Sequence, residues 1–303
     1  MAAAETLIGL GAHLVALVVP SNRTGVDVTR AENMAQQRGL TQLTQPETSD
    51  IGSFADRLRT LAPDLAVIWS YSMILPPELI SLLPLGCVNV HSGLLPEYRG
   101  GHVMQWAIIN GECETGVTLH YLDEGIDTGP LIAQSRFPIE IHDDGVSVQR
   151  KLQLSGTALL QAWWPRIAQG TAPRLSQDES RARYHRLLTP KDGLVDWNAG
   201  SMAIHNLVRA LVSPRPGAFT FLQEQKIVIR RAMLTSEVSG TVSPGTIVEL
   251  SQHGASVATG DGELSITEVE SDGAVIEPSE FTAVGIIPGV LFTDSPSVLH
   301  RTQ

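Results

Sequence analysis

Short apolar runs alternate with amphipathic stretches over the first half of the chain. Five runs have the length and the Val, Ile and Leu content of buried strands, and they lie at 13–19, 65–70, 86–90, 116–122 and 129–139. Apolar side chains recur with helical spacing in the stretches between and after them, at 29–39, 51–63, 76–84, 102–111 and 145–170. Strands that alternate with helices predict an α/β domain with a doubly wound, mostly parallel sheet.

The pattern changes after Gly193. One amphipathic stretch at 201–211 predicts a helix, and short strand-like runs separated by Gly, Pro and Asp follow it at 217–222, 226–234, 245–251, 254–260 and 262–270. Many short strands of this kind predict a small all-β unit, most simply a barrel. We therefore expect a catalytic domain at 1–178, a polar linker at 179–193 and an all-β domain at 194–303.

The amino-terminal stretch 2–11 (AAAETLIGLG) predicts a helix rather than a strand. A doubly wound domain normally opens on a central strand, so we expect the first strand to be absent here or to be encoded upstream. The glycines of GLG, at 9–11, then end a helix. A dinucleotide-binding turn needs the opposite order, with a strand before the glycines and a helix after them.

Composition narrows the class of protein. With 303 residues, 43% of them hydrophobic, the chain can bury one large core or two. The formal net charge of −11 disfavours nucleic acid as a partner, because phosphate binding needs clustered Lys and Arg. No apolar run is long enough to span a membrane, and the start lacks the basic region and cleavage pattern of a signal peptide. Two lone cysteines, Cys87 and Cys113, are most simply interpreted as small buried apolar residues. We expect a cytoplasmic protein.

The segment CVNVHSGLLPEYRGGH carries the candidate chemistry. Asn89 and His91 are two residues apart at the end of a predicted strand, so both side chains project from one face. In open α/β sheets the carboxyl ends of the strands border the ligand site. Asn supplies a neutral donor for a developing oxyanion, and His supplies a donor or base with a pKa near neutrality.

Such a site also needs a carboxylate that orients His91 or shifts its pKa, and Asp127 is the candidate. It follows His91 by one helix and one strand, a distance over which the chain can fold back beside the His. Asp127-Thr128-Gly129 also matches the tripeptide of aspartic proteases, but a pepsin-like chain needs two such motifs in an almost all-β fold. A lone His is usually structural and a lone DTG is usually a turn, so the signal lies in the ordered combination.

The remaining histidines do not predict a metal site. They are scattered, with no His-Glu-x-x-His or paired-Cys spacing. His102 and His120 are close enough in sequence to the motif to contact a substrate. A packing or surface role is the simpler interpretation of both.

These segments resemble the folate-dependent formyltransferases, which include methionyl-tRNA formyltransferase, glycinamide ribonucleotide formyltransferase and the sugar-nucleotide formyltransferases. The family pattern of Asn-x-His, Leu-Leu-Pro, Thr-Gly-x-Thr and Asp-x-Gly occurs here at 89–91, 94–96, 115–118 and 127–129. The stretch LVRALVSPRPGAFTFLQEQKIVIRRA resembles the OB-like carboxyl-terminal barrel of the tRNA and sugar enzymes. The resemblance implies a Rossmann-like α/β domain followed by an OB-like barrel.

The resemblance also implies roles for individual residues. Asn89 and His91 would polarise the formyl carbonyl of 10-formyltetrahydrofolate, and Asp127 would hold His91 in its working state and help move protons. The pterin would lie against two loops, whose residues are Tyr71, Ser72, Met73, Ile74, Leu75, Leu122, Asp123, Glu124 and Gly125.

The acceptor is less well defined by the sequence. Gly93 stands where the tRNA enzymes usually have Ser, and RGGHVMQW replaces their Arg-Gly-Ala-Ala-Pro, so this region is nearer to the sugar-nucleotide enzymes. We expect an N-formyltransferase for a small-molecule amine, such as an amino-sugar nucleotide. Methionyl-tRNA formyltransferase is the close alternative, and a 10-formyltetrahydrofolate hydrolase or an inactive truncated homologue are the remoter ones. The sequence leaves a homodimer open.

Overall fold

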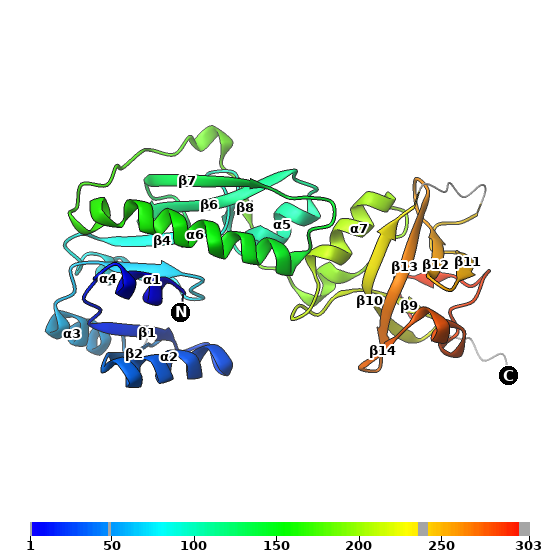
Figure 1. Cartoon of the computed structure of the whole chain (residues 1–303), viewed down its shortest axis with the longest axis horizontal. Helices are drawn as coiled ribbons and strands as arrows, with labels where there is room; N and C mark the ends of the chain where they lie inside the picture. The colour runs from blue at the N-terminus through cyan, green and yellow to red at the C-terminus, as the bar shows by residue number, and fades with distance from the viewer. Residues whose placement is uncertain (1, 48–49, 236–241, 297–303) are drawn as a thin grey trace. The chain divides into compact units, whose positions relative to one another are not determined.

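A computed structural model describes residues 2–47, 50–235 and 242–296 of the chain (Figure 1). The chain divides into two compact units, each assembled from three segments. The first unit contains Met1–Val103, Thr115–Phe137 and Arg150–His185, and the second contains Met104–Glu114, Pro138–Gln149 and Arg186–Gln303. Among the described helices none is both long enough and apolar enough to cross a membrane.

Helices and strands alternate through the first half, as predicted. In chain order they are α1 (Ala2–Gly9), β1 (Ala16–Pro20), α2 (Val26–Arg38), β2 (Thr41–Gln45), α3 (Ile51–Leu61), β3 (Ala66–Trp69), α4 (Pro77–Ile80), β4 (Cys87–His91), β5 (Arg99–Gly100), α5 (Val103–Ile109), β6 (Glu114–Tyr121), β7 (Leu131–Pro138) and α6 (Gly145–Ala168). A short helical turn, η1 (Glu179–Arg181), and β8 (Tyr184–His185) follow. The ends of the helices follow local signals: α2 stops at Gly39, whose φ of 64° is the left-handed cap that glycine adopts without strain.

The strands form a mixed arrangement rather than one continuous sheet. β1 pairs with β2 in parallel, and β3 pairs with β4 in parallel, which confirms the parallel strands predicted for this half. β4 and β6 are antiparallel, and the larger sheet has the order β3-β4-β6-β7. The sequence analysis missed β2, because Thr41-Gln42-Leu43-Thr44-Gln45 has a single strongly apolar residue.

Helix α6 fixes the position of β4 by packing closely onto the sheet. A Cβ atom at Gly156 would lie 2.7 Å from the Trp69 ring and 3.1 Å from Val90, so a residue with a side chain would push the helix away. β4 is buried at every position except Asn89, which is half-buried. The strand that carries Asn89 and His91 is therefore held rigidly from one side.

The two parallel strand pairs are separate sheets, and a cavity of about 1090 Å³ lies between them. Residues of β1 and of β3 line it from opposite sides, together with α1 and the end of α6. The apolar residues of β3 are consequently only half-buried, in contrast to those of β4. Figure 1 shows α1 in the space between β1 and β4, next to the amino terminus.

The second unit contains the predicted all-β fold. A helical turn, η2 (Pro190–Gly193), and α7 (Ser201–Ala210) precede the strands β9 (Ala218–Leu222), β10 (Gln225–Leu234), β11 (Ile247–Ser251), β12 (Gly254–Ala258), β13 (Glu263–Ser271) and β14 (Ala274–Ile276), and η3 (Pro278–Val284) and β15 (Phe292–Thr293) end the fold. The antiparallel order is β11-β12-β13-β10-β9-β15, with β14 beside β13. Hydrogen bonds from Ile247 N to Val290 O and from Phe292 N to Gly245 O, both 2.9 Å, join the first and last strands and curl the sheet into a barrel.

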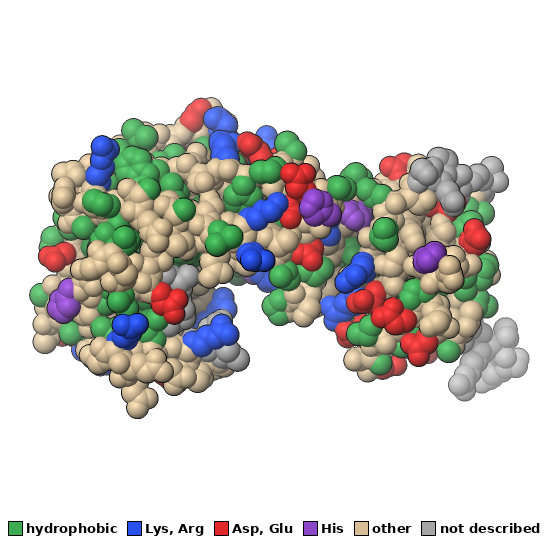
Figure 2. All heavy atoms as spheres, in the orientation of Figure 1, with side chains coloured by type: hydrophobic (Ala, Val, Ile, Leu, Met, Phe, Trp, Pro, Cys, Tyr) green, Lys and Arg blue, Asp and Glu red, His purple; other side chains and the backbone are tan. Residues whose placement is uncertain are grey.

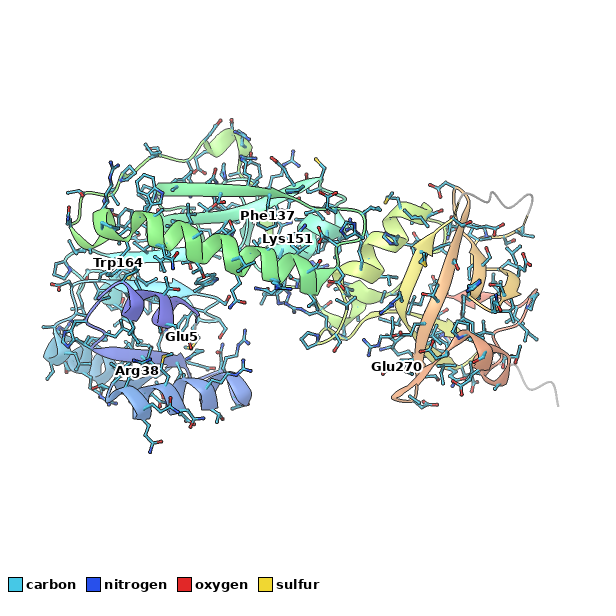
Figure 3. All side chains as sticks on the ribbon, in the orientation of Figure 1. Glu5, Arg38, Phe137, Lys151, Trp164 and Glu270 are labelled. Atoms are coloured by element: carbon cyan, nitrogen blue, oxygen red, sulfur yellow. The ribbon has the colours of Figure 1, made fainter. Side chains whose placement is uncertain are left out.

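Acidic side chains gather near β14 on the face of the second unit that Figure 2 shows. One of them, Glu270, labelled in Figure 3, accepts a hydrogen bond from Arg230 Nε at 2.9 Å. This surface is in keeping with the acidic balance of the whole sequence.

Candidate active site

β4 brings Asn89 and His91 to one face of the larger sheet. In the antiparallel register Asn89 lies opposite His120 of β6, and His91 lies opposite Thr118. Side chains two residues apart on β4 share a face, and so do those directly across from them on β6. The predicted pair therefore gains a third polar side chain, His120, which is fully buried.

The loop between β6 and β7 delivers Asp127. Tyr121 N donates to Pro130 O at 2.9 Å, which closes the loop into a hairpin. Asp127 adopts a left-handed backbone conformation, with φ of 55°, and its Oδ1 lies 3.6 Å from His91 Nδ1 and 3.6 Å from His120 Nε2. Its Oδ2 accepts a hydrogen bond from the Gly100 backbone N–H at 2.9 Å. The structure thus brings the three predicted residues, Asn89, His91 and Asp127, into one cluster.

Asp127 reaches His91 by way of an antiparallel strand, β6, in a sheet that was predicted to be mostly parallel. Because β6 is antiparallel to β4, the loop after β6 begins at the amino end of β4, where Leu122 N donates to Cys87 O at 2.9 Å. The loop then returns over the sheet to place Asp127 by His91. The cluster therefore lies over one face of the sheet as well as outside the carboxyl ends of its strands.

His120 lies at the centre of the cluster, where the sequence analysis favoured a packing role. Its Nδ1–H donates to Tyr121 O at 2.9 Å, so Nε2 is the acceptor in the neutral ring. Asn89 Nδ2 donates to that Nε2 at 3.1 Å. One amide hydrogen of Asn89 is used in this way, and the second remains for a ligand. His102, by contrast, lies in the turn before α5, with a left-handed φ of 52°.

Burial and charge together set the protonation of the cluster. Burial lowers the pKa of His91, and the nearby Asp127 carboxylate opposes that effect. Burial would raise the pKa of Asp127, but His91, His120 and the Gly100 N–H outweigh it and lower the pKa to about 2. Asp127 is therefore a carboxylate at every pH at which the protein would work.

Hydrogen bonds to backbone carbonyls orient both rings. His91 Nε2 lies 2.6 Å from Tyr98 O, and a carbonyl can only accept, so this nitrogen carries the hydrogen. In the neutral rings the lone pair of His91 Nδ1 faces Asp127, and the lone pair of His120 Nε2 accepts from Asn89. The cluster is thus rich in hydrogen-bond acceptors.

The same geometry could accommodate a cation. One ligand atom from each of His91, His120 and Asp127 lies within 4.8 Å of the others. The sequence analysis expected no metal site, and that expectation stays a prediction. The hydrogen bonds to Tyr98, Tyr121 and Gly100 fix these side chains whether or not an ion is bound.

Gln177 and Arg99 form a brace that supports the loop containing Asp127. Gln177 Nε2 donates to the carbonyls of Asp127 and Gly129, at 2.8 and 2.7 Å. Gln177 Oε1 accepts from Arg99 Nε at 3.1 Å and from Nη2 at 2.8 Å. Arg99 has no exposed surface, and its Nη2 also lies 2.6 Å from Glu179 Oε1. No local sequence pattern predicts this brace, because its members are up to 80 residues apart.

Two glycines permit the close approaches that the brace requires. A Cβ at Gly129 would lie 1.8 Å from Tyr121 O, and one at Gly100 would lie 2.2 Å from His185 O. Gly93, the position that departs from the tRNA enzymes, is also crowded, because a Cβ there would lie 3.1 Å from His91 Nε2. A serine in its place would need the His91 ring or its neighbours to shift.

The residues expected to contact the pterin occupy two loops. In the loop after β3, Tyr71 Oη donates to Gln45 Oε1 at 2.9 Å, while the Ile74 side chain is 74% exposed. In the loop after β6, Asp123 Oδ1 accepts from Gly125 N at 3.1 Å. Backbone groups and exposed apolar side chains are thus available in both loops, and their contact with a folate stays a prediction.

Two family models match the chain. The formyl transferase model matches residues 8–162, and the model of the formyl transferase C-terminal domain matches residues 187–284. The methionyl-tRNA formyltransferase of Citrifermentans bemidjiense is 35% identical over 274 residues, which cover 89% of this chain and 85% of that protein.

Solved structures share the fold at low sequence identity. WlaRD, a sugar 3N-formyl transferase solved in the presence of dTDP and 5-N-formyl-THF, has a TM-score of 0.66 at 20% identity, with 90% of this chain and 94% of that chain covered. The N-formyltransferase from Helicobacter canadensis, in complex with folinic acid and dTDP-3-aminofucose, has a TM-score of 0.59 at 21% identity, covering 84% and 99%. HypX from Aquifex aeolicus, in complex with tetrahydrofolic acid, has a TM-score of 0.64 at 20% identity, and 90% of this chain spans about half of HypX, 47%.

The resemblance inferred from the Asn-x-His and Asp-x-Gly motifs is therefore confirmed. The matched segments include both the α/β half that holds Asn89, His91 and Asp127 and the all-β half that follows it. The chain is a formyltransferase and belongs to the formyl transferase family.

Proposed function

We propose that the protein moves the formyl group of 10-formyltetrahydrofolate to a primary amine. The observation that carries this proposal is the contact of Asn89, His91, His120 and Asp127 within one buried cluster of a formyltransferase chain. The folate supplies the formyl group, and the loops at 71–75 and 122–125 would hold its pterin. Solved relatives with tetrahydrofolate or its formyl derivatives support a folate cosubstrate.

The cluster suits the charge changes of this reaction. The amine nitrogen attacks the formyl carbon, and the carbonyl π electrons move to its oxygen. The free amide hydrogen of Asn89 would stabilise that oxyanion. The amine must lose a proton and the departing folate nitrogen must gain one, so the net reaction conserves protons. His91, with a lone pair toward Asp127, would relay this proton, while the Asp127 carboxylate stabilises the imidazolium that forms transiently.

Two acceptors have specific support. The net charge of −11 and the fold shared with sugar N-formyltransferases solved with dTDP or dTDP-3-aminofucose favour an amino-sugar nucleotide. The 35% identity to a methionyl-tRNA formyltransferase, over 85% of that protein, favours methionyl-tRNA. We propose the small-molecule amine first, with methionyl-tRNA as the second candidate.

A transfer assay tests the reaction and the acceptor together. Release of tetrahydrofolate from 10-formyltetrahydrofolate would be followed with no acceptor, with a panel of amino-sugar nucleotides and with methionyl-tRNA. Turnover with one amine class alone confirms the transferase and identifies its acceptor. Turnover without any amine would instead indicate a hydrolase, and folate binding without turnover in any reaction would contradict the proposal.

A further inference from the structure

Two side chains of the larger sheet hold the His91 turn, the segment 92–98 that follows β4. β6 and β7 are the next strands of that sheet (Figure 1). Thr118 of β6 lies opposite His91 in the register and is fully buried. Its hydroxyl donates to Gly93 O at 2.7 Å and accepts from Leu95 N at 3.2 Å. Two backbone groups of the turn are thus tied to the neighbouring strand.

Gln134 of β7 completes the arrangement. Its Nε2 donates to Leu95 O at 2.8 Å and to Thr118 Oγ1 at 3.0 Å. A hydroxyl has one hydrogen and two lone pairs, and a side-chain amide nitrogen has two hydrogens, so both groups use their full hydrogen-bonding capacity. Polar networks in which every member is satisfied are rigid and specify one geometry. Thr118 and Gln134 therefore form a clamp on the His91 turn.

The clamped turn makes two contacts with the His91 ring. Tyr98 N donates to Leu94 O at 2.9 Å, and the Tyr98 carbonyl lies 2.6 Å from His91 Nε2. Gly93 lies close to the same nitrogen, because a Cβ there would be 3.1 Å from His91 Nε2. A shift of the turn would therefore move both the hydrogen-bond acceptor of the ring and the backbone against which the ring packs.

The acceptor at Nε2 decides which nitrogen of His91 carries the hydrogen. With Nε2–H on Tyr98 O, the lone pair of the neutral ring is on Nδ1 and faces Asp127 Oδ1, which is 3.6 Å away. Without that acceptor the hydrogen would move to Nδ1, where the carboxylate can accept it. The lone pair would then be on Nε2, which does not face Asp127.

We propose that Thr118, together with Gln134, is a positioning residue for formyl transfer, which holds the His91 turn so that His91 keeps its hydrogen on Nε2 and its lone pair toward Asp127. This inference rests on the proposed function, in which His91 relays the proton. Thr118 acts through the turn and not by contact with the reacting atoms.

Substitutions in the full chain that remove only the clamp test the proposal. Thr118→Val keeps the shape of the side chain and removes the hydroxyl, so kcat should fall by roughly ten- to a hundredfold while the KM for the folate changes little. Thr118→Ser restores the hydroxyl and should recover most of the lost kcat. Thr267→Val is the matched control, because the Thr267 hydroxyl is buried without a hydrogen-bond partner in the described part of the chain, and its kcat should be unchanged.

NMR of the His91 ring nitrogens is the readout that a purely structural role would not change. At about pH 8, where a histidine ring is neutral, the unsubstituted protein should show the hydrogen on Nε2, with the signal assigned by its loss in His91→Gln. Thr118→Val should move part of the population to the Nδ1–H form, whereas Thr118→Ser and Thr267→Val should not.

Gln134→Met provides the test from a half-buried position if Thr118→Val does not fold. It removes the amide donors of the clamp and should produce the same change in the ring spectrum. An unchanged spectrum and kcat in these variants would overturn the proposal, even if their melting temperatures fell. Equal losses in Thr118→Ser and Thr118→Val would also overturn it, because the hydroxyl would then not be the cause. The spectrum needs no substrate, so a lack of formyl transfer by the unsubstituted protein would count against the proposed function and leave the test of the clamp intact.

Discussion

The side-chain amide of Gln177 donates a hydrogen bond to the backbone carbonyl of Asp127, 2.8 Å away and 50 residues earlier in the chain. The contact matters because Asp127 is held in a left-handed conformation, with φ of 55°, in a loop that has no regular secondary structure. Gln177 therefore anchors the loop from outside, in addition to the hydrogen bond that Gly100 N donates to Asp127 Oδ2.

Gln177→Glu isolates this anchoring. A Glu keeps an oxygen for Arg99 but cannot donate to the carbonyls of Asp127 and Gly129, so we expect kcat to fall by up to roughly a hundredfold as Asp127 loses its position. The KM for folate should change little. A lower melting temperature with unchanged kcat would show that Gln177 supports only the fold, and Gln177→Ala provides the comparison in which Arg99 also loses its partner.

His91→Ala should remove most of the activity. The variant loses the group that relays the proton, and we expect turnover to drop by about 10²- to 10⁴-fold. Folate binding, measured by quenching of intrinsic fluorescence, should persist, because the pterin loops are separate from His91. Turnover close to that of the unsubstituted protein would contradict the proposed role of His91 in proton relay.

Asp127→Asn should lower kcat by a comparable factor without removing the side-chain shape. The neutral amide can still accept the hydrogen bond from Gly100 N, but it cannot stabilise a protonated His91. A change confined to the KM for folate would instead identify Asp127 as a ligand contact. Stopped-flow measurement of single turnovers separates these two outcomes.

Stability should decline on acidification in two steps. The pKa of buried His91 is below its ordinary value, so the unfolded chain binds a proton first and stability falls as the pH drops below about 6.5. The pKa of Asp127 is also lowered, to about 2, so its contribution is complete above about pH 4 and is lost as the pH falls toward 2. Urea unfolding across this range should show both steps.

Matched variants identify the groups responsible for those steps. His91→Gln should flatten the upper step, and Asp127→Asn should flatten the lower one. Equal pH dependence in both variants and the unsubstituted protein would mean that other groups control acid stability.

Chelators provide a test of the metal question. If the cluster works by proton transfer alone, EDTA should leave formyl transfer unchanged. Added Zn²⁺ should inhibit, because it would compete for the lone pairs of His91, His120 and Asp127, whose ligand atoms lie within 4.8 Å of each other. Loss of turnover in EDTA, restored by a metal ion, would contradict the expectation of a metal-free site.

Much of the fold and part of the site were accessible from the sequence. Apolar runs and helix-capping residues are local signals, so the alternation of α2, β3, β4 and α6 was predictable. Asn89 and His91 were identified because the two-residue period of a strand fixes their common face. β2 was missed because its residues are mostly polar, and packing in the folded chain overrides that weak propensity.

The parts that escaped prediction depend on contacts between distant segments. His120 joins the cluster only through the antiparallel register of β4 with β6, which no local pattern reveals. Arg99 and Gln177 are ordinary polar residues in the sequence, and their role arises when the segment at 177–185 folds back on the Asp127 loop. Hydrogen bonds over such separations are set by tertiary structure.

The pairing of β5 with β8 has a practical consequence for anyone who prepares the α/β half by itself. Arg99 and Gly100 pair with Tyr184 and His185, which belong to the segment expected to serve as a linker. A protease cut or an engineered stop at residue 178 would remove that pairing, and with it the Glu179 carboxylate that faces the fully buried Arg99 guanidinium. A fragment intended to retain the catalytic geometry should therefore extend beyond His185.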